Sequence, residues 1–446
     1  MEYLPLVMFL VLLLMLMAGY PVSLTLGAVA LMFASIGMVF DIMRPDFFQL
    51  ATYRIYGIVQ NFTLLAVPLF VFMGVVFEKS GLADELLETM AMVFARVRGG
   101  LAISIIVVGG LLAATTGIVG ATVVTMTVIA LPTMLKHGYK PELATGTIAA
   151  SGTLGQLLPP SVILVLLASV MNISPGDVFA ATVIPGAILI GAFILFIYFN
   201  ARFNPEVAPL FDAKTMLKNQ DRTLLTRVIR GLLPPISLIV AVLGSIFFGL
   251  ATPTEAAAFG ALGAMILAAL NKRLTYKNVR EAVRSTTRLT SMVFLILIGA
   301  TAFGLVFNGL HGDQLMKDII AAIPGGIWGF ILFSMLLIFI LGFFLDFLEI
   351  SFIVVPLLAV AAQAKGIDLV WFAVLIAVNL QTSFLTPPFG FSLFYLKAAA
   401  PPEIRINHIY RGVIPFIILQ VLILMILIIW PGLSTWLPEQ MSLWQR

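Results

Sequence analysis

The sequence predicts an all-α, polytopic membrane protein on the basis of its low charge content, its apolar runs of helical length and the lack of a strand pattern. Of the 446 residues, 61% are hydrophobic and 10% are charged, whereas a soluble domain carries about 25% charged residues. The apolar runs are about 20 residues long, which is the length that a helix needs to cross a bilayer. The alternation of apolar and polar residues that is typical of a membrane β-barrel is missing.

The composition also argues against several kinds of site. The chain has no cysteine and three histidines, which lie far apart. We therefore expect no disulfide, no thiol chemistry and no transition-metal site. The net charge of +4 is modest, and the basic residues are confined to loops. They are expected to set the orientation in the membrane rather than to bind nucleic acid.

The first part of the chain, residues 1–98, is predicted to contain membrane spans and interfacial helices. Leu4–Phe40 is too long for a cleaved signal peptide and has no basic start. We expect two spans here, separated near Gly19-Tyr20-Pro21. The stretches Asp46–Asn61 and Asp84–Arg98 are amphipathic and are expected to lie along the membrane interface.

Two basic segments predict the orientation of the chain. Asn200–Arg230 and Asn271–Arg288 are rich in lysine and arginine, and two expected spans, Gly231–Leu250 and Glu255–Leu270, separate them within the middle part 201–323. Both segments then lie on one side of the membrane, which the positive-inside rule makes the cytoplasm. Neither segment is long enough to be a soluble domain. A soluble module that captures a ligand would therefore belong to another polypeptide.

Counting spans outward from these loops predicts a re-entrant helical hairpin at 99–135. Basic residues flank both of its ends, and its centre, Ala113–Thr122, is rich in small residues. A hairpin of two half-helices fits this pattern if its tip is buried in protein. The next apolar segment, 143–171, should be a helix broken at Pro159-Pro160. Together these elements form a predicted first repeat, 99–200.

The same count predicts a second hairpin, at 324–364, that enters and leaves the membrane from the opposite side. Its tip is expected at Leu345–Ser351, where two acidic residues interrupt the apolar run. A second broken helix, 369–397, follows and carries Pro387-Pro388. The second repeat and the last span with its tail are then 324–400 and 401–446.

The two regions align with each other. Pro159-Pro160 corresponds to Pro387-Pro388, and Gly138 corresponds to Gly366, both at an offset of 228 residues. Similar blocks in opposite orientation constitute an inverted repeat. Interrupted apolar segments at corresponding positions indicate the binding site of a secondary transporter, because free carbonyls and half-helix ends can face a ligand near the midplane.

Three motifs resemble the large membrane subunit (DctM type) of the TRAP, or tripartite ATP-independent periplasmic, transporters. They are "SGTLGQLLPPS" (Ser151–Ser161), "GLATPTEAAAFGALGA" (Gly249–Ala264) and "NLQTSFLTPPFGFSLF" (Asn379–Phe394). The resemblance covers nearly the whole chain. It implies an elevator-type architecture, in which interfacial helices help to form a wide scaffold, and it implies a multi-pass protein of the bacterial inner membrane that is not an enzyme.

The resemblance further implies Na⁺-driven uptake of a carboxylate or another organic acid. The substrate would be delivered by a periplasmic binding protein, and a small four-helix membrane subunit would complete the complex. One departure stands out. Related hairpin tips carry several serines, whereas this chain has Thr116-Gly117-Ile118-Val119, which shifts the expected ligands of Na⁺ from side chains to backbone carbonyls.

We predict that Na⁺ binds at the two breaks and the two tips, because hard cations prefer oxygen ligands such as carbonyls, hydroxyls and carboxylates. The predicted ligands are Thr115, Thr116 and Gly120 in the first tip, Gly155, Leu157 and Pro159 at the first break, Asp346 and Glu349 in the second tip, and Thr382, Leu385 and Thr386 at the second break. Acidic residues at membrane depth are usually functional. Ordinary helix packing explains Gly and Thr at the tips equally well, and Asp346 and Glu349 have an alternative role as caps of a half-helix.

Polar residues beside the breaks are candidates for contact with the substrate. They are Gln156, Ser161, Asn379 and Gln381. The helix N-termini after the breaks, at Ser161 and Phe389, would face a carboxylate with their positive ends. The alternative is that these side chains only satisfy the broken backbone.

Three other functions remain open at this stage. A stand-alone anion permease of the same superfamily would need no binding protein. A membrane-embedded enzyme would use Asp346 and Glu349, but the inverted repeat has no role in such chemistry. A channel is the third, although a closed pair of hairpins favours alternating access.

Overall fold

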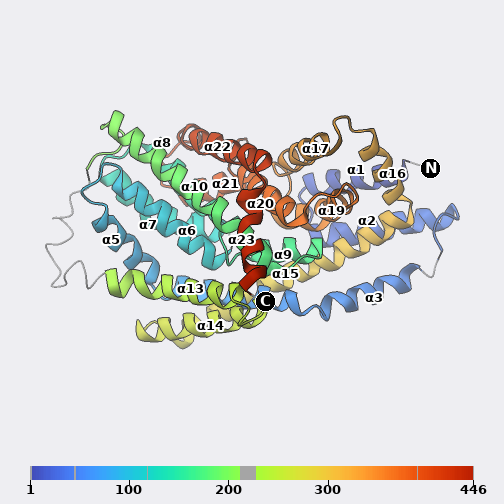
Figure 1. Ribbon diagram of the computed structural model, residues 1–446, viewed down its shortest axis with the longest axis horizontal. Coiled ribbons are helices and arrows are strands. Elements are labelled where there is room, and N and C mark those ends of the chain that lie inside the picture. Colours follow the sequence, from blue (N-terminus) through green and yellow to red (C-terminus); the bar gives the residue numbers. More distant parts are fainter. Residues whose placement is uncertain (1–2, 45–46, 118, 211–227, 389, 445–446) are drawn as a thin grey trace.

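The computed structural model describes residues 3–44, 47–117, 119–210, 228–388 and 390–444 (Figure 1). Within these ranges the chain is helical and contains no strand. Eight of the described helices are long and apolar enough to cross a membrane by length and composition. The prediction of an all-α, polytopic membrane protein is therefore confirmed.

The N-terminal part forms two apolar helices followed by shorter ones, and a left-handed glycine, Gly19 (φ 85°), separates the first two as predicted. The elements are α1 (Leu4–Met17), α2 (Val22–Val39), α3 (Phe47–Val59), the 3-10 helix η1 (Phe62–Leu65), α4 (Ala66–Lys79) and α5 (Leu82–Val93). The two amphipathic stretches predicted to be interfacial correspond to α3 and α5. Helices α2 and α4 pack against α15 (Tyr276–Gly309), and α4 also packs against α14 (Pro253–Leu270).

The first repeat begins with two helices that meet in a tight turn. Helix α6 (Gly100–Thr116) ends at Gly117, whose φ of 61° lies in the left-handed region that favours glycine. The remaining elements are α7 (Val119–Lys136), α8 (Pro141–Thr153), the 3-10 turn η2 (Leu154–Gln156), α9 (Val162–Met171) and α10 (Pro175–Phe203). The predicted turn and the predicted break before α9 are both present.

The middle part differs from the prediction in one respect. We predicted Asn271–Arg288 to be a loop, but α15 starts at Tyr276, so most of this basic segment extends the following helix. The hydroxyl oxygen of Thr275 caps the helix by accepting from the Asn278 N–H at 3.2 Å. Charged residues are compatible with a helix in water. The change from apolar to polar residues therefore marks where the chain leaves the membrane, and not where the helix begins.

The other elements of the middle part are the π-helical turn η3 (Val228–Leu232), α13 (Leu233–Phe247) and α16 (Gly312–Ala322). Of the other predicted basic segment, Asn200–Arg230, residues 211–227 lie outside the described part of the chain.

The second repeat has the same order of elements as the first. It comprises α17 (Gly326–Leu341), α18 (Phe347–Glu349), the π-helical segment η4 (Ile350–Val354), α19 (Val355–Ala364), α20 (Leu369–Leu385) and α21 (Phe391–Ala399). The aligned glycines Gly138 and Gly366 both have positive φ, at 78° and 71°, after the second helix of their hairpins. Two more helices, α22 (Ile406–Ile429) and α23 (Gly432–Trp444), follow.

The two repeats interlock through their hairpins. Each hairpin packs against the pre-break helix of its own repeat, so α6 and α7 contact α8, while α17 and α19 contact α20. Each also packs against the post-break helix of the other repeat, since α7 contacts α21 and α19 contacts α9. In Figure 1, α6, α7 and α8 lie on the left, α17 and α19 lie on the right, and α20 lies between them. This exchange of partners brings the two breaks and the two tips into one region.

Candidate functional site

The tip of the first hairpin lies directly against the first break. A Cβ atom added to Gly117 would lie 3.0 Å from the backbone nitrogen of Val162, the first residue of α9. A Cβ atom added to Gly155 would lie 2.5 Å from the carbonyl oxygen of Ala113 in α6. Glycine at both positions therefore lets the backbone of the tip and the backbone of the break approach each other closely.

The second tip contacts the second break in the same way. The ring of Phe347 lies 6.0 Å, centroid to centroid, from that of Phe384, which in turn lies 5.3 Å from that of Phe391. Gly342, at the end of α17, faces the side chain of Ser383 so closely that a Cβ atom there would collide with it. In the first repeat the hairpin and the broken helix each carry a close-contact glycine, Gly117 and Gly155, and in the second repeat Gly342 is on the hairpin.

These two contacts predict different responses to substitution. Gly342→Ala should lower stability by about 1–3 kcal/mol, as overpacking typically does, and Ser383→Gly should restore it because the obstacle is a side chain. Gly155→Ala should be at least as damaging, and Ala113→Gly should not rescue it, because there the obstacle includes a backbone carbonyl. Thermal unfolding of the purified single and double variants measures both effects. Rescue of both pairs, or of neither, would contradict the observed packing.

The first break leaves backbone carbonyls without helical partners. Gly155 and Gln156 would each accept from the N–H four residues on, but those residues are Pro159 and Pro160, which have none. The N–H of Leu157 donates to Leu154 O at 3.0 Å. Gly155, Leu157 and Pro159, the predicted ion ligands here, are all buried. The carbonyls of Gly155 and Gln156 thus lack their helical donors in a buried part of the protein.

Three of the four predicted substrate residues carry buried polar atoms without a partner. The amide groups of Gln156 and Gln381 and the hydroxyl of Ser161 are fully buried and have no hydrogen-bond partner within the described residues. Ser161 is the N-cap of α9, and its side chain makes no capping bond. Phe389 lies outside the described residues, and Gly390 is the N-cap of α21. Unpaired buried amides are costly, so these groups are candidates for contact with a polar ligand.

Asn379, the fourth residue, has a partner. Its Nδ2 donates to the carbonyl oxygen of Met335 at 2.6 Å, which joins α20 to α17 of its own hairpin. The carbonyl of Phe384 is likewise occupied, since it accepts from the hydroxyl of Ser392 at 2.8 Å across the second break. The second break is therefore more completely satisfied by the protein than the first.

The threonines of the second break donate to their own helix. Thr382 Oγ1 donates to Val378 O at 2.8 Å, and Thr386 Oγ1 donates to Thr382 O at 2.7 Å. Thr382 and Leu385 are fully buried. A hydroxyl that donates its hydrogen keeps its lone pairs, so both oxygens still have the chemistry of a cation ligand.

The acidic residues of the second tip form a capping box. Asp346 is the N-cap of α18, and its Oδ1 accepts from the Phe347 N–H at 2.6 Å. The Oε2 of Glu349 accepts from the Asp346 N–H at 3.1 Å. This is the alternative role that the sequence left open for the two carboxylates. Each carboxylate has further lone pairs, so capping and cation binding are compatible.

Tyr395 lies against the first tip and was not among the residues that the sequence predicted. The ring lies against the first hairpin, where a Cβ atom added to Gly120 would be 3.0 Å from its Cε2. The only available signal was a single tyrosine in a short helix after the second break. The side chains of Thr115 and Thr116, predicted ligands in the first tip, lie outside the described part of the structure.

Comparison with known proteins identifies the family. The family described as "Tripartite ATP-independent periplasmic transporter, DctM component" matches residues 8–433. The chain belongs to this family. It is 30% identical over 427 residues to the sialic acid TRAP transporter large permease protein SiaM of Vibrio cholerae, covering 95% of this chain and 96% of that protein.

Two further similarities agree with this assignment. The C4-dicarboxylate TRAP transporter large permease protein DctM of Vibrio cholerae is 28% identical over 452 residues, covering 95% of each chain. The crystal structure of the Alcanivorax borkumensis YdaH transporter superposes with a TM-score of 0.64 at 15% identity, covering 97% of this chain and 99% of that one. At this identity the superposition supports the fold alone.

The predicted resemblance to TRAP large membrane subunits is thus confirmed. The permease is a multi-pass protein of the bacterial inner membrane and one part of a tripartite system. Such a system also contains a small membrane subunit and a substrate-binding protein. The relatives are transport permeases, which agrees with the expectation of a transporter and not an enzyme.

Proposed function

We propose that the permease couples the inward movement of Na⁺ to the uptake of an organic acid that a periplasmic binding protein delivers. The observation that carries this proposal is the meeting of two broken helices and two hairpin tips around the unpartnered amides of Gln156 and Gln381. The named substrates of the relatives, sialic acid and C4-dicarboxylates, are carboxylates. Amide N–H groups, a serine hydroxyl and the N-terminus of α9 are suitable donors for a carboxylate.

The coupling ion would bind beside the substrate. The free carbonyls of Gly155 and Gln156 at the first break, and the hydroxyls of Thr382 and Thr386 at the second, are hard oxygen ligands. The carboxylate of Asp346 would neutralise part of the charge. A cation held next to the substrate carboxylate makes each ligand strengthen the binding of the other, which is the thermodynamic basis of symport.

Transport would follow an elevator mechanism. The interlocked repeats would move as one body against α2, α4, α14 and α15. In this second group α4 packs against α14 and α15, and α2 packs against α15. The close glycine contacts between tips and breaks support movement as a single body, because packed interfaces of this kind do not deform continuously.

Reconstituted vesicles test this function. The permease and its small membrane subunit are inserted into vesicles with an inward Na⁺ gradient, and uptake of radiolabelled sialic acid and succinate is measured with and without the cognate binding protein. We expect uptake that requires the gradient and the binding protein together. Uptake that continues after K⁺ replaces Na⁺ would contradict sodium coupling. Uptake that needs no binding protein would establish the stand-alone permease instead.

A further inference from the structure

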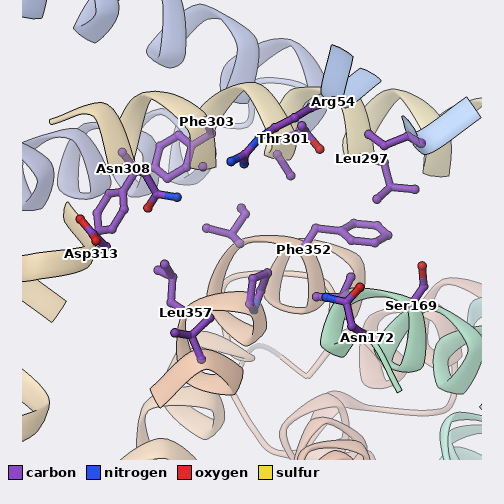
Figure 2. Close-up of a pocket in the computed structure, with 18 of the residues that line it drawn as sticks. Arg54, Ser169, Asn172, Leu297, Thr301, Phe303, Asn308, Asp313, Phe352 and Leu357 are labelled. Carbon is purple, nitrogen blue, oxygen red and sulfur yellow. The ribbon is translucent and has the colours of Figure 1, made fainter. Parts of the chain in front are cut away.

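A cavity of about 640 Å³ lies away from the breaks and the tips (Figure 2). Helices α3, α15 and α16 form one side of it, and α9, η4 and α19 form the other. None of the residues proposed above for Na⁺ or substrate is among its described lining residues. The cavity therefore lies between α15 and the part of the second hairpin formed by η4 and α19. Its ligand is not expected to be the Na⁺ or the substrate proposed above.

The inner wall of the cavity is apolar. Its most buried members, each with an exposed fraction of 5% or less, are Leu64, Phe303, Phe307, Phe352 and Ile353. In Figure 2, Phe303 lies on α15, and Phe352 and Leu357 project from the opposite wall. A wall of this kind favours a hydrocarbon chain, and it would strip water from a small organic acid without replacing the lost hydrogen bonds.

The rim of the cavity is polar and includes the positive charge of Arg54. Arg54, Asn172 and Asn308 are exposed members of the lining. Asp313 and Lys317 largely cancel each other, with the carboxylate and ammonium groups 3.9 Å apart. Arg54 has no ion-pair partner among the described residues, and Figure 2 shows its side chain running from α3 along α15, with the guanidinium between Phe303 and Thr301. An apolar interior beneath a cationic rim matches an anionic amphiphile.

We propose that this cavity binds an acyl chain of an anionic phospholipid, whose phosphate lies on the guanidinium of Arg54. Arginine binds phosphate through a planar fork of N–H donors, and the asparagine side chains at the rim can donate to the remaining headgroup oxygens. The bound chain fills the space between α15 and the arm of the second hairpin formed by η4 and α19. This site is independent of the proposed transport function and requires neither Na⁺ nor substrate.

Photolabelling of the full-length permease tests the proposal. The protein is reconstituted into vesicles of phosphatidylethanolamine and phosphatidylglycerol that contain phosphatidylglycerol with a diazirine near the end of one acyl chain. After irradiation, labelled peptides are mapped by mass spectrometry. We expect the label to concentrate on α15 near Phe303 and Phe307 and on η4 near Phe352. Labelling no stronger there than on the exposed surface of α14 would overturn the proposal.

Matched variants test separately how the apolar interior and the charged rim contribute to lipid binding. Leu357→Trp should fill the cavity and remove its labelling, whereas Leu262→Trp, at an exposed position of α14, should leave it intact. Arg54 is exposed, so Arg54→Gln should leave the fold unchanged while lowering labelling about fivefold, as the loss of one cationic contact with an anionic lipid predicts. Arg54→Lys should retain most of it. Unchanged labelling in both Leu357→Trp and Arg54→Gln would contradict a lipid site.

A competition experiment distinguishes the two sources of an anion. Excess succinate or inorganic phosphate should leave the labelling of α15 and η4 unchanged, whereas unlabelled phosphatidylglycerol should reduce it. Displacement of the label by the soluble anions would overturn the proposal and assign the cavity to a water-soluble ligand.

Discussion

Replacing Asp346 with asparagine should abolish Na⁺-driven uptake while leaving the protein as stable as the native chain. Asparagine caps a helix about as well as aspartate, so the bond from the Phe347 N–H to the side chain at position 346 is kept. The negative charge is lost. At a separation of ~4 Å and an effective dielectric constant of ~20, a unit charge contributes ~4 kcal/mol to holding a monovalent cation. We therefore expect the apparent affinity for Na⁺ to fall roughly 1000-fold, since each ~1.4 kcal/mol is tenfold.

The comparison that isolates this effect uses a second aspartate with the same capping role. Asp368 is the N-cap of α20, and its Oδ1 accepts from the Trp371 N–H at 2.7 Å. Asp368→Asn should keep both stability and the Na⁺ dependence of uptake. The measurements are initial uptake rates over a series of Na⁺ concentrations, together with thermal unfolding. If Asp346→Asn takes up substrate with the native Na⁺ dependence, Asp346 is only a cap.

The sequence was sufficient to predict the course of the chain because helix breaks and membrane boundaries have local causes. Tandem prolines remove two N–H donors wherever they occur, so the breaks before α9 and α21 followed from Pro159-Pro160 and Pro387-Pro388 alone. A run of small residues likewise located the turn at Gly117. The predicted start of α15 was wrong because no local signal of this kind marks it. Its first turns are charged and lie outside the apolar window, and polarity alone does not distinguish a loop from a helix in water.

The roles of the individual polar residues could not be predicted, because they depend on partners far away in the chain. Asn379 and Gln381 are two residues apart and look equivalent in the sequence. In the fold Asn379 faces the carbonyl of Met335, whereas the amide of Gln381 has no partner in the described structure. Tyr395 is similar, since only the packing of α21 against α7 places its ring beside Gly120. Periodicity and composition contain no information about such contacts.

The buried glutamines provide the clearest separation of stability from function. Gln156→Leu and Gln381→Leu should each strongly reduce uptake without destabilising the protein. An unpaired buried amide costs about 1–3 kcal/mol, and leucine has a similar volume with no polar atoms, so thermal stability should be unchanged or higher. A hydrogen bond to a charged ligand contributes about 1.5–3 kcal/mol, so substrate binding should weaken about 10–150-fold. Asn379→Leu should behave differently and lower stability, because it removes the bond to Met335 and leaves that carbonyl unpaired.

Gln420 on α22 supplies the matched control for the glutamine variants. It is also fully buried, its amide has no partner among the described residues, and it belongs to neither break and to neither hairpin. Gln420→Leu should therefore match the stability of the other two variants and retain uptake. Thermal unfolding and initial uptake rates in vesicles measure both quantities on the same preparations. Loss of uptake in all three variants would mean that the buried amides support the structure of the protein and do not contact the substrate. Loss in Gln156→Leu and Gln381→Leu alone would assign them to the substrate, because no difference in packing chemistry distinguishes them from Gln420.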